Sequence, residues 1–167
     1  MANDESVCPM AEPQAEHRWL EQMVGEWESE AECIMEPGQP PAIFKGKETV
    51  RSLGGLWVLA EGSGEMPGGG AMTTLLTLGY DPARQRYVGT FVGSMMTHLW
   101  VYEGMLEGRV LTLDTQGPDF STGGKSMARF TDAIEIIDRD NRVMTSRMQG
   151  QDGQWRHIMT ARYRRIG

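Results

Sequence analysis

The sequence predicts an all-β fold, a closed antiparallel up-and-down barrel of about ten strands with a short N-terminal helix. Hydrophobic residues alternate with a period of two over most of the chain after Gly25, which is typical of strands with one buried face. Turn residues, many of them among the 21 glycines, separate these segments. The connections are short enough for hairpins, and closing such a long meander removes its exposed edges.

A short helix is predicted over residues 13–24, because Trp19, Leu20 and Met23 fall on one helical face. Pro13 suits the first turn of this helix, and Gly25 suits its end. Residues 1–12 are expected to form a disordered acidic tail, which leaves residues 13–167 as a single β-barrel domain.

The first strand follows Gly25 and separates charge from apolar surface. Four glutamates point to one side, at positions Glu26, Glu28, Glu30 and Glu32. The other side carries Trp27, Ser29, Ala31, Cys33 and Met35. This pattern indicates a half-buried strand with a solvated acidic face, so we do not expect the glutamates to bind a metal.

The remaining strands are predicted between segments rich in glycine, proline, asparagine and aspartate. They span residues 42–53, 56–65, 71–80, 86–95, 97–106, 109–115, 125–137, 142–149 and 154–164. A longer loop is expected over residues 117–124. A barrel of this size is wide enough to hold one small ligand among its interior side chains.

Composition excludes some classes of partner. The formal net charge of −7 argues against binding nucleic acid or an anionic membrane surface. The two cysteines, Cys8 and Cys33, are too few for a disulfide framework and fit a reducing compartment. The sequence shows neither a secretory signal nor an apolar run long enough to span a membrane. We therefore expect a cytoplasmic protein with no membrane partner.

The histidines are the first candidates for chemistry. His17 falls beside the apolar stripe of the helix and is expected to be solvated. His98 shares a predicted strand face with Trp100 and Tyr102, and alternation in the last strand points His157 into the barrel. Either inward histidine is an interior hydrogen-bonded residue, a group that orients a ligand, or a haem or metal ligand.

Large, adaptable side chains form the predicted ligand-binding set. Its members are Trp27, Met95, His98, Trp100, Tyr102, His157 and Met159, with Met35 and Tyr163 as further lining candidates. The alternative interpretation is ordinary core packing. Single carboxylates could also enter the lumen, and alternation leaves the facing of Glu61, Glu103 and Asp114 open.

The sequence contains neither the motif of a nucleophilic serine nor a phosphate-binding loop. No Gly-x-Ser-x-Gly occurs, and a strand rather than a helix follows the glycine cluster at residues 62–70. That cluster is therefore interpreted as a loop rather than a phosphate cradle. No catalytic residue and no metal ligand set is predicted.

A family resemblance rests on several motifs. The helix followed by Gly25-Glu-Trp27 is similar to the start of calycin-type barrels, the lipocalins and their relatives. Together with residues 51–57, 66–69, 78–82, 87–90, 100–104 and 159–165, it resembles a bacterial family catalogued as domain of unknown function 1579. This resemblance covers about residues 16–165 and implies a calycin-like barrel without an assigned activity.

A more distant resemblance is to the nitrobindin-type haem-binding barrels, whose haem ligand is a histidine near the C-terminal end. His157 lies in the corresponding region. Three hypotheses follow for the function: a barrel that binds a small apolar molecule, a haem-binding protein or small-molecule enzyme that uses a lumen histidine, or a ligand-free structural or interaction protein, which could be a homodimer.

Overall fold

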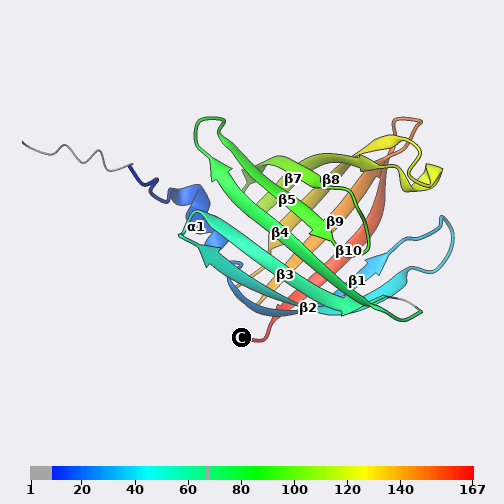
Figure 1. Cartoon of the computed structure of the whole chain (residues 1–167), viewed down its shortest axis with the longest axis horizontal. Helices are drawn as coiled ribbons and strands as arrows, with labels where there is room; N and C mark the ends of the chain where they lie inside the picture. The colour runs from blue at the N-terminus through cyan, green and yellow to red at the C-terminus, as the bar shows by residue number, and fades with distance from the viewer. Residues whose placement is uncertain (1–8, 67) are drawn as a thin grey trace, which may run out of the picture.

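The computed structural model describes residues 9–66 and 68–167. Within them, ten strands close into one barrel in the order β1-β10-β9-β8-β7-β6-β5-β4-β3-β2 (Figure 1). Each strand pairs antiparallel with its neighbours in the chain, and β1 (Gly25–Cys33) pairs with β10 (Trp155–Arg165) to close the ring. The predicted barrel is therefore confirmed. Most of the predicted tail, residues 1–8, lies outside the described residues.

The other strands lie close to their predicted bounds. They are β2 (Ala42–Leu53), β3 (Trp57–Glu65), β4 (Ala71–Asp81), β5 (Arg86–Gly93), β6 (Trp100–Glu107), β7 (Val110–Pro118), β8 (Met127–Ile136) and β9 (Asn141–Gln149). Strand β6 begins three residues later than predicted, and Met95 lies in the turn after β5. A short 3-10 helix, Phe120–Thr122, forms inside the predicted long loop because the Asp119 side chain accepts the Ser121 N–H at its start.

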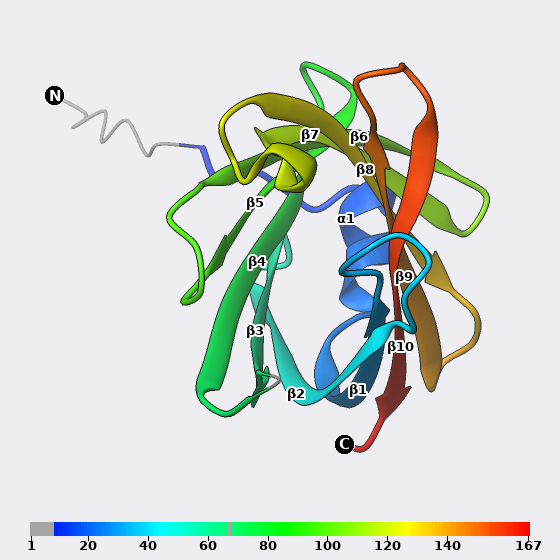
Figure 2. The same ribbon diagram turned by 90° about the vertical axis from the view of Figure 1, so that its right-hand side faces the viewer.

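The helix α1 (Ala15–Glu21) is shorter than predicted. His17 does not face solvent as predicted but is buried, because its ring caps the helix. Its Nδ1 accepts the backbone N–H of Gln14 at 2.9 Å, and its Nε2 lies 3.1 Å from the carbonyl oxygen of Tyr80 in β4. With Nδ1 accepting, the ring proton is on Nε2, which donates to that carbonyl. These bonds hold α1 against one end of the barrel (Figures 1 and 2).

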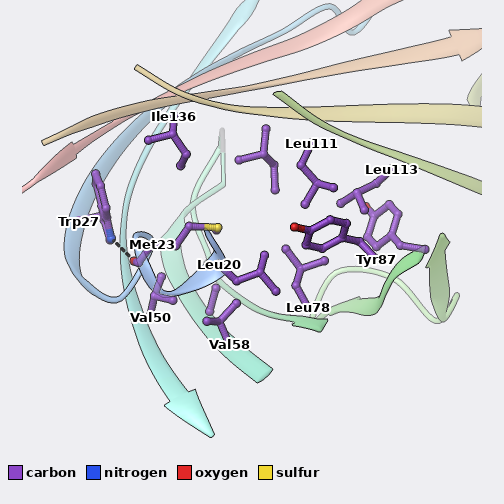
Figure 3. Packing of buried hydrophobic residues seen from close by; sticks show 13 residues of the cluster. Leu20, Met23, Trp27, Val50, Val58, Leu78, Tyr87, Leu111, Leu113 and Ile136 are labelled. Carbon is purple, nitrogen blue, oxygen red and sulfur yellow. Dashed lines mark hydrogen bonds between the residues drawn. The ribbon is translucent and has the colours of Figure 1, made fainter. Parts of the chain in front are cut away.

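The hydrophobic core lies at this same end (Figure 3). The buried Trp27 ring donates its Nε1 proton to the carbonyl oxygen of Met23 at 2.8 Å, so the segment after α1 is bonded to β1. The Arg165 guanidinium stacks 4.3 Å from the Trp27 ring centroid and donates to the carbonyl oxygens of Gln22 and Val24. The end of β10 thus covers the same segment. Among the described residues, no helix is long and apolar enough to cross a membrane.

Candidate functional site in the barrel lumen

The interior of the barrel has two halves that differ in burial. We call the half beside α1 the closed half. Most of its inward side chains are well packed, although Leu106 and Met144 are partly exposed. Those that are at most 2% exposed include Trp27, Val50, Val58, Ala60, Leu78, Leu111 and Ile134. We call the other half the open half. Many of its inward side chains are partly exposed, among them Ser29, Ala31, Phe44, Met72, Leu76, Phe91, Met148 and Met159. Side chains that face the lumen yet meet solvent show that water enters the open half.

One wall of the open half is built from very small residues. Strands β1 to β3 place Ala31, Ala42, Gly46, Gly62 and Gly64 on their inner faces. A Cβ at Gly46 would come within 2.5 Å of a backbone oxygen, and one at Gly62 within 2.4 Å of the Thr74 hydroxyl. Glycine inside a strand often marks close approach of a backbone or a ligand. Here the missing side chains let neighbouring backbone and the Thr74 side chain pack closely against these strands.

The opposite wall is aromatic. Trp100 and Phe130 pack edge-to-face with ring centroids 4.9 Å apart, and the Trp100 ring lies directly against Gly117. Trp100 donates its Nε1 proton to the Met96 sulfur at 3.0 Å. His98 lies in the loop before β6 rather than in a strand, with its ring 4.9 Å from Trp100 and its Nε2 2.9 Å from the Gln116 carbonyl. His98 therefore supports the rim of this wall.

A group of buried polar side chains lies between the two halves. The Tyr102 hydroxyl donates to Asp132 Oδ2 at 2.5 Å, reaching across β7 from β6 to β8. Ser146 is the cross-strand partner of Asp132 and forms a hydrogen bond to the same carboxyl. Thr115 is only 8% exposed, and its hydroxyl has no partner. We call Tyr102, Thr115, Asp132 and Ser146 the polar floor.

Burial shifts the pKa of two groups in the polar floor. Desolvation raises the pKa of Asp132 above its ordinary value, and the hydrogen bonds from Ser146 and Tyr102 oppose that rise. Desolvation and the neighbouring Asp132 charge raise the pKa of Tyr102, so its hydroxyl keeps its proton. The floor therefore presents one carboxyl, one phenol and two hydroxyls without a basic group.

The closed half contains its own charge pair. Arg142 forms an ion pair with Glu48, and both side chains are buried. The Arg142 guanidinium lies 3.9 Å from the Tyr163 ring centroid and 4.7 Å from that of Trp27. Burial, together with the nearby Glu48 charge, raises the pKa of Tyr163. The positive charge of Arg142 is thus compensated within the barrel and enclosed by aromatic rings.

The structure brings together only part of the predicted ligand-binding set. Trp100 and Tyr102 adjoin the open half, and Met159 lines it directly. Trp27 is packed into the closed half, with Tyr163 beside it. Met95 packs its sulfur against Gly93 in the turn after β5. The lining candidate Met35 is 70% exposed beyond the end of β1.

The predicted inward orientation of His157 is wrong. The pairing of β10 with β9 shifts register between His157 and Met159, which is a β-bulge. Alternation breaks at this point, so Met159 faces the lumen while His157 is exposed and its Nε2 lies 2.9 Å from the Thr160 hydroxyl. A haem inside the barrel would therefore not meet this imidazole.

The carboxylates that face the lumen are not the ones proposed as candidates from the sequence. Glu61, Glu103 and Asp114 are all exposed on the outer surface, where they contact Arg51, Arg84 and Thr131 respectively. Glu48 and Asp132, which do point inward, were not among those candidates. Alternation could have found them: Glu48 is in phase with Phe44 and Val50, and Asp132 with Phe130, Ile134 and Ile136.

Two hollows lie outside the lumen. A groove of about 570 Å³ runs beside α1 and is lined by Trp19, Ile137, Arg109, Arg139 and Arg165 among others. A hollow of about 380 Å³ lies at the rim of the open half, between the β7–β8 and β9–β10 connections. Neither contains the polar floor. In the part of the chain that the structure describes, no group of three or more histidine, cysteine, aspartate or glutamate side chains could hold a metal ion.

Comparison with known proteins places the chain in a family. A model of the family described as "Protein of unknown function (DUF1579)" matches residues 12–165, so the chain belongs to this family. No curated protein matches the chain.

Solved structures are similar in fold. The Rv2717c protein of M. tuberculosis has 13% sequence identity and a TM-score of 0.63, and the match covers 93% of this chain and all of that one. A de novo designed fluorescence-activating β-barrel has 12% identity and a TM-score of 0.48, over 87% of this chain and 95% of that one. At 13% identity the likeness to Rv2717c concerns the fold alone, and the match to the designed barrel supports no conclusion.

Proposed function

We propose that the protein binds a small, largely apolar molecule in the open half of its barrel. The observation that carries this proposal is the burial contrast along the strands. Inward side chains are packed beside α1 but many remain partly exposed further along the same strands, so a ligand that enters the open half would contact them directly. Ligand sites are concave, mostly apolar and equipped with a few polar groups.

The lining fits an apolar guest. Phe44, Leu76, Phe91, Met148 and Met159 supply apolar contact, and methionine adapts its shape to different ligands. The glycine and alanine wall lets a flat or extended molecule approach the backbone. The polar floor would then orient the guest, because its Thr115 hydroxyl is buried without a partner.

Blocking the open half tests this proposal. Ala31→Phe would project a ring into the lumen, whereas Ile43→Phe adds a ring at an outward site that is 48% exposed on the neighbouring strand. Nile red, a neutral dye that fluoresces in apolar surroundings, would serve as the probe. We expect saturable binding to the native chain and to Ile43→Phe, and about tenfold weaker binding to Ala31→Phe, equivalent to about 1.4 kcal/mol.

Far-UV circular dichroism would establish that both variants retain the strand content of the barrel. Equal Nile red affinity for the two folded variants would show that the dye binds elsewhere and would contradict the proposal. Absence of saturable binding to the native chain would contradict it as well.

A further inference from the structure

The polar floor has an unusual charge balance for the interior of a barrel. Within the described residues, three charged side chains face the middle of the lumen: Glu48, Asp132 and Arg142. Arg156 and Arg165 share the inward register but lie at the two ends of β10, where they pair with Asp152 and Asp140. Arg142 is already paired with Glu48. None of the ion pairs formed by the described residues includes Asp132. The floor of the open half thus has a carboxyl but no cation to neutralise it.

The hydrogen-bonding capacity of the floor is also one-sided. Tyr102 and Ser146 both bond to the Asp132 carboxyl. Above its raised pKa, the ionised Asp132 carboxylate accepts about four hydrogen bonds, so about two of its positions remain free. The Thr115 hydroxyl is more than nine-tenths buried and has no partner. A guest that reaches the floor therefore meets more acceptors than donors.

This arrangement discriminates between head groups. A carboxylate or phosphate would bring a second negative charge next to Asp132 in a poorly solvated space, where like charges repel strongly. An alcohol or an ammonium would instead donate to the free positions of Asp132 and to the Thr115 oxygen. Buried polar groups that lack such a partner reject the analogue that cannot supply it.

We propose that the polar floor recognises a hydrogen-bond donor, an alcohol or an ammonium group, at the end of an apolar ligand and discriminates against carboxylates. This inference rests on the proposed function, because it assigns the head group of a molecule bound in the open half. It makes the protein a carrier or sensor of apolar alcohols or amines rather than of fatty acids.

Displacement of Nile red by three ligands with the same chain tests this inference: 1-dodecanol, dodecylamine and dodecanoate, each below its aggregation concentration. At about pH 8, dodecylamine is an ammonium and dodecanoate an anion. We expect at least one of the two donors to bind about tenfold more tightly than dodecanoate. A preference confined to dodecylamine assigns an ammonium ligand, and a preference that includes dodecanol assigns an alcohol.

Variants at two aspartates locate the effect. Asp132→Asn should reduce the preference to about threefold or less, mainly because dodecanoate binds more tightly. Asp114→Asn is the matched control, since this carboxylate lies on the outer surface in the neighbouring strand, and the preference should not change. Should Asp132→Asn fail to fold, Thr115→Val provides a second test with almost the same shape, and it should weaken dodecanol or dodecylamine severalfold while Nile red still binds.

The outcomes separate the two proposals. Saturable Nile red binding with equal affinity for dodecanoate and both donors would overturn the inference and leave the proposed function standing. An unchanged preference in folded Asp132→Asn would also overturn the inference alone. Failure of Nile red to bind the native chain would overturn both.

Discussion

The two halves of the barrel are built on the same ten strands yet differ in how completely they are filled. In the closed half, α1 contributes Leu20 and the segment after it contributes Met23, and both pack among large inward side chains. In the open half no α-helix of the described residues enters, and strands β1 to β3 turn alanine and glycine inward. Stability and binding are therefore expected to separate along the barrel axis.

Breaking the charge pair of the closed half should have the largest effect. Arg142→Met leaves the Glu48 carboxylate buried without its partner, which typically costs about 3–5 kcal/mol. Urea unfolding would measure the loss. Arg164→Met is the control, because its ion pair with Glu28 is exposed and is worth at most about 1 kcal/mol. A loss of similar size in both variants would show that burial does not set the cost.

Two leucines on β4 compare the halves directly. Leu78 is fully buried in the closed half, and Leu76 faces the lumen two residues earlier, where it is only partly buried. Leu78→Ala should lower the free energy of unfolding by about 2–5 kcal/mol, because the packed surroundings leave a cavity. Leu76→Ala should lose about 1 kcal/mol, since solvent already reaches this end. Equal losses would indicate that the open half is as well packed as the closed half.

Adding a large side chain should also affect the stability of the two halves differently, with the greater loss in the closed half. Ala60 is 1% exposed in the closed half, so Ala60→Phe should destabilise the protein by about 1–3 kcal/mol through overpacking. On the proposed function, the ring of Ala31→Phe would occupy the ligand space of the open half and should leave the melting temperature nearly unchanged. Thermal unfolding of the two variants would measure the difference. A large loss in Ala31→Phe would mean that the open half lacks room for a ligand.

A smaller effect should appear in the pH dependence of stability. Burial raises the folded-state pKa of Asp132 above its unfolded value, so the folded chain binds more protons than the unfolded chain between these two values. The contribution of Asp132 to stability therefore decreases as pH rises through that window. Unfolding free energies measured from about pH 4 upward should fall for the native chain relative to Asp132→Asn. A parallel pH profile for both proteins would contradict the burial of an ionisable group at this position.

The sequence predicts the barrel well because its strands obey local rules. Period-two alternation and glycine-rich turns define the ten strands within a few residues, and the motif around Gly25 and Trp27 marks where the helix meets the barrel. The candidate site is harder to predict. Trp100, Tyr102 and Met159 adjoin or line the open half as the alternation indicates, but the alternation does not show which inward residues the helix end covers.

The wrong predictions have physical causes that a single sequence does not reveal. One extra residue in β10 turns His157 outward, and this bulge depends on its pairing with β9 rather than on local composition. His17 is buried because its ring caps its own helix and contacts the backbone of Tyr80, a long-range contact. The inward orientation of Glu48 and Asp132 is not predicted because charged residues are usually outside. Their partners, Arg142 and Tyr102, come from other strands that are not adjacent to theirs.

The pairing of β1 with β10 has a consequence for how the chain acquires its fold. Trp27 lies opposite Arg165, so the ring closes only when segments from the two ends of the barrel domain meet. During synthesis, β1 leaves the ribosome long before β10. One edge of β1 therefore stays unpaired until β10 has been made. Hairpins between neighbouring strands can form early, but the Trp27 ring receives its Arg165 cover last. The newly made chain is therefore most exposed to wrong strand pairing at the edge that the mature barrel hides.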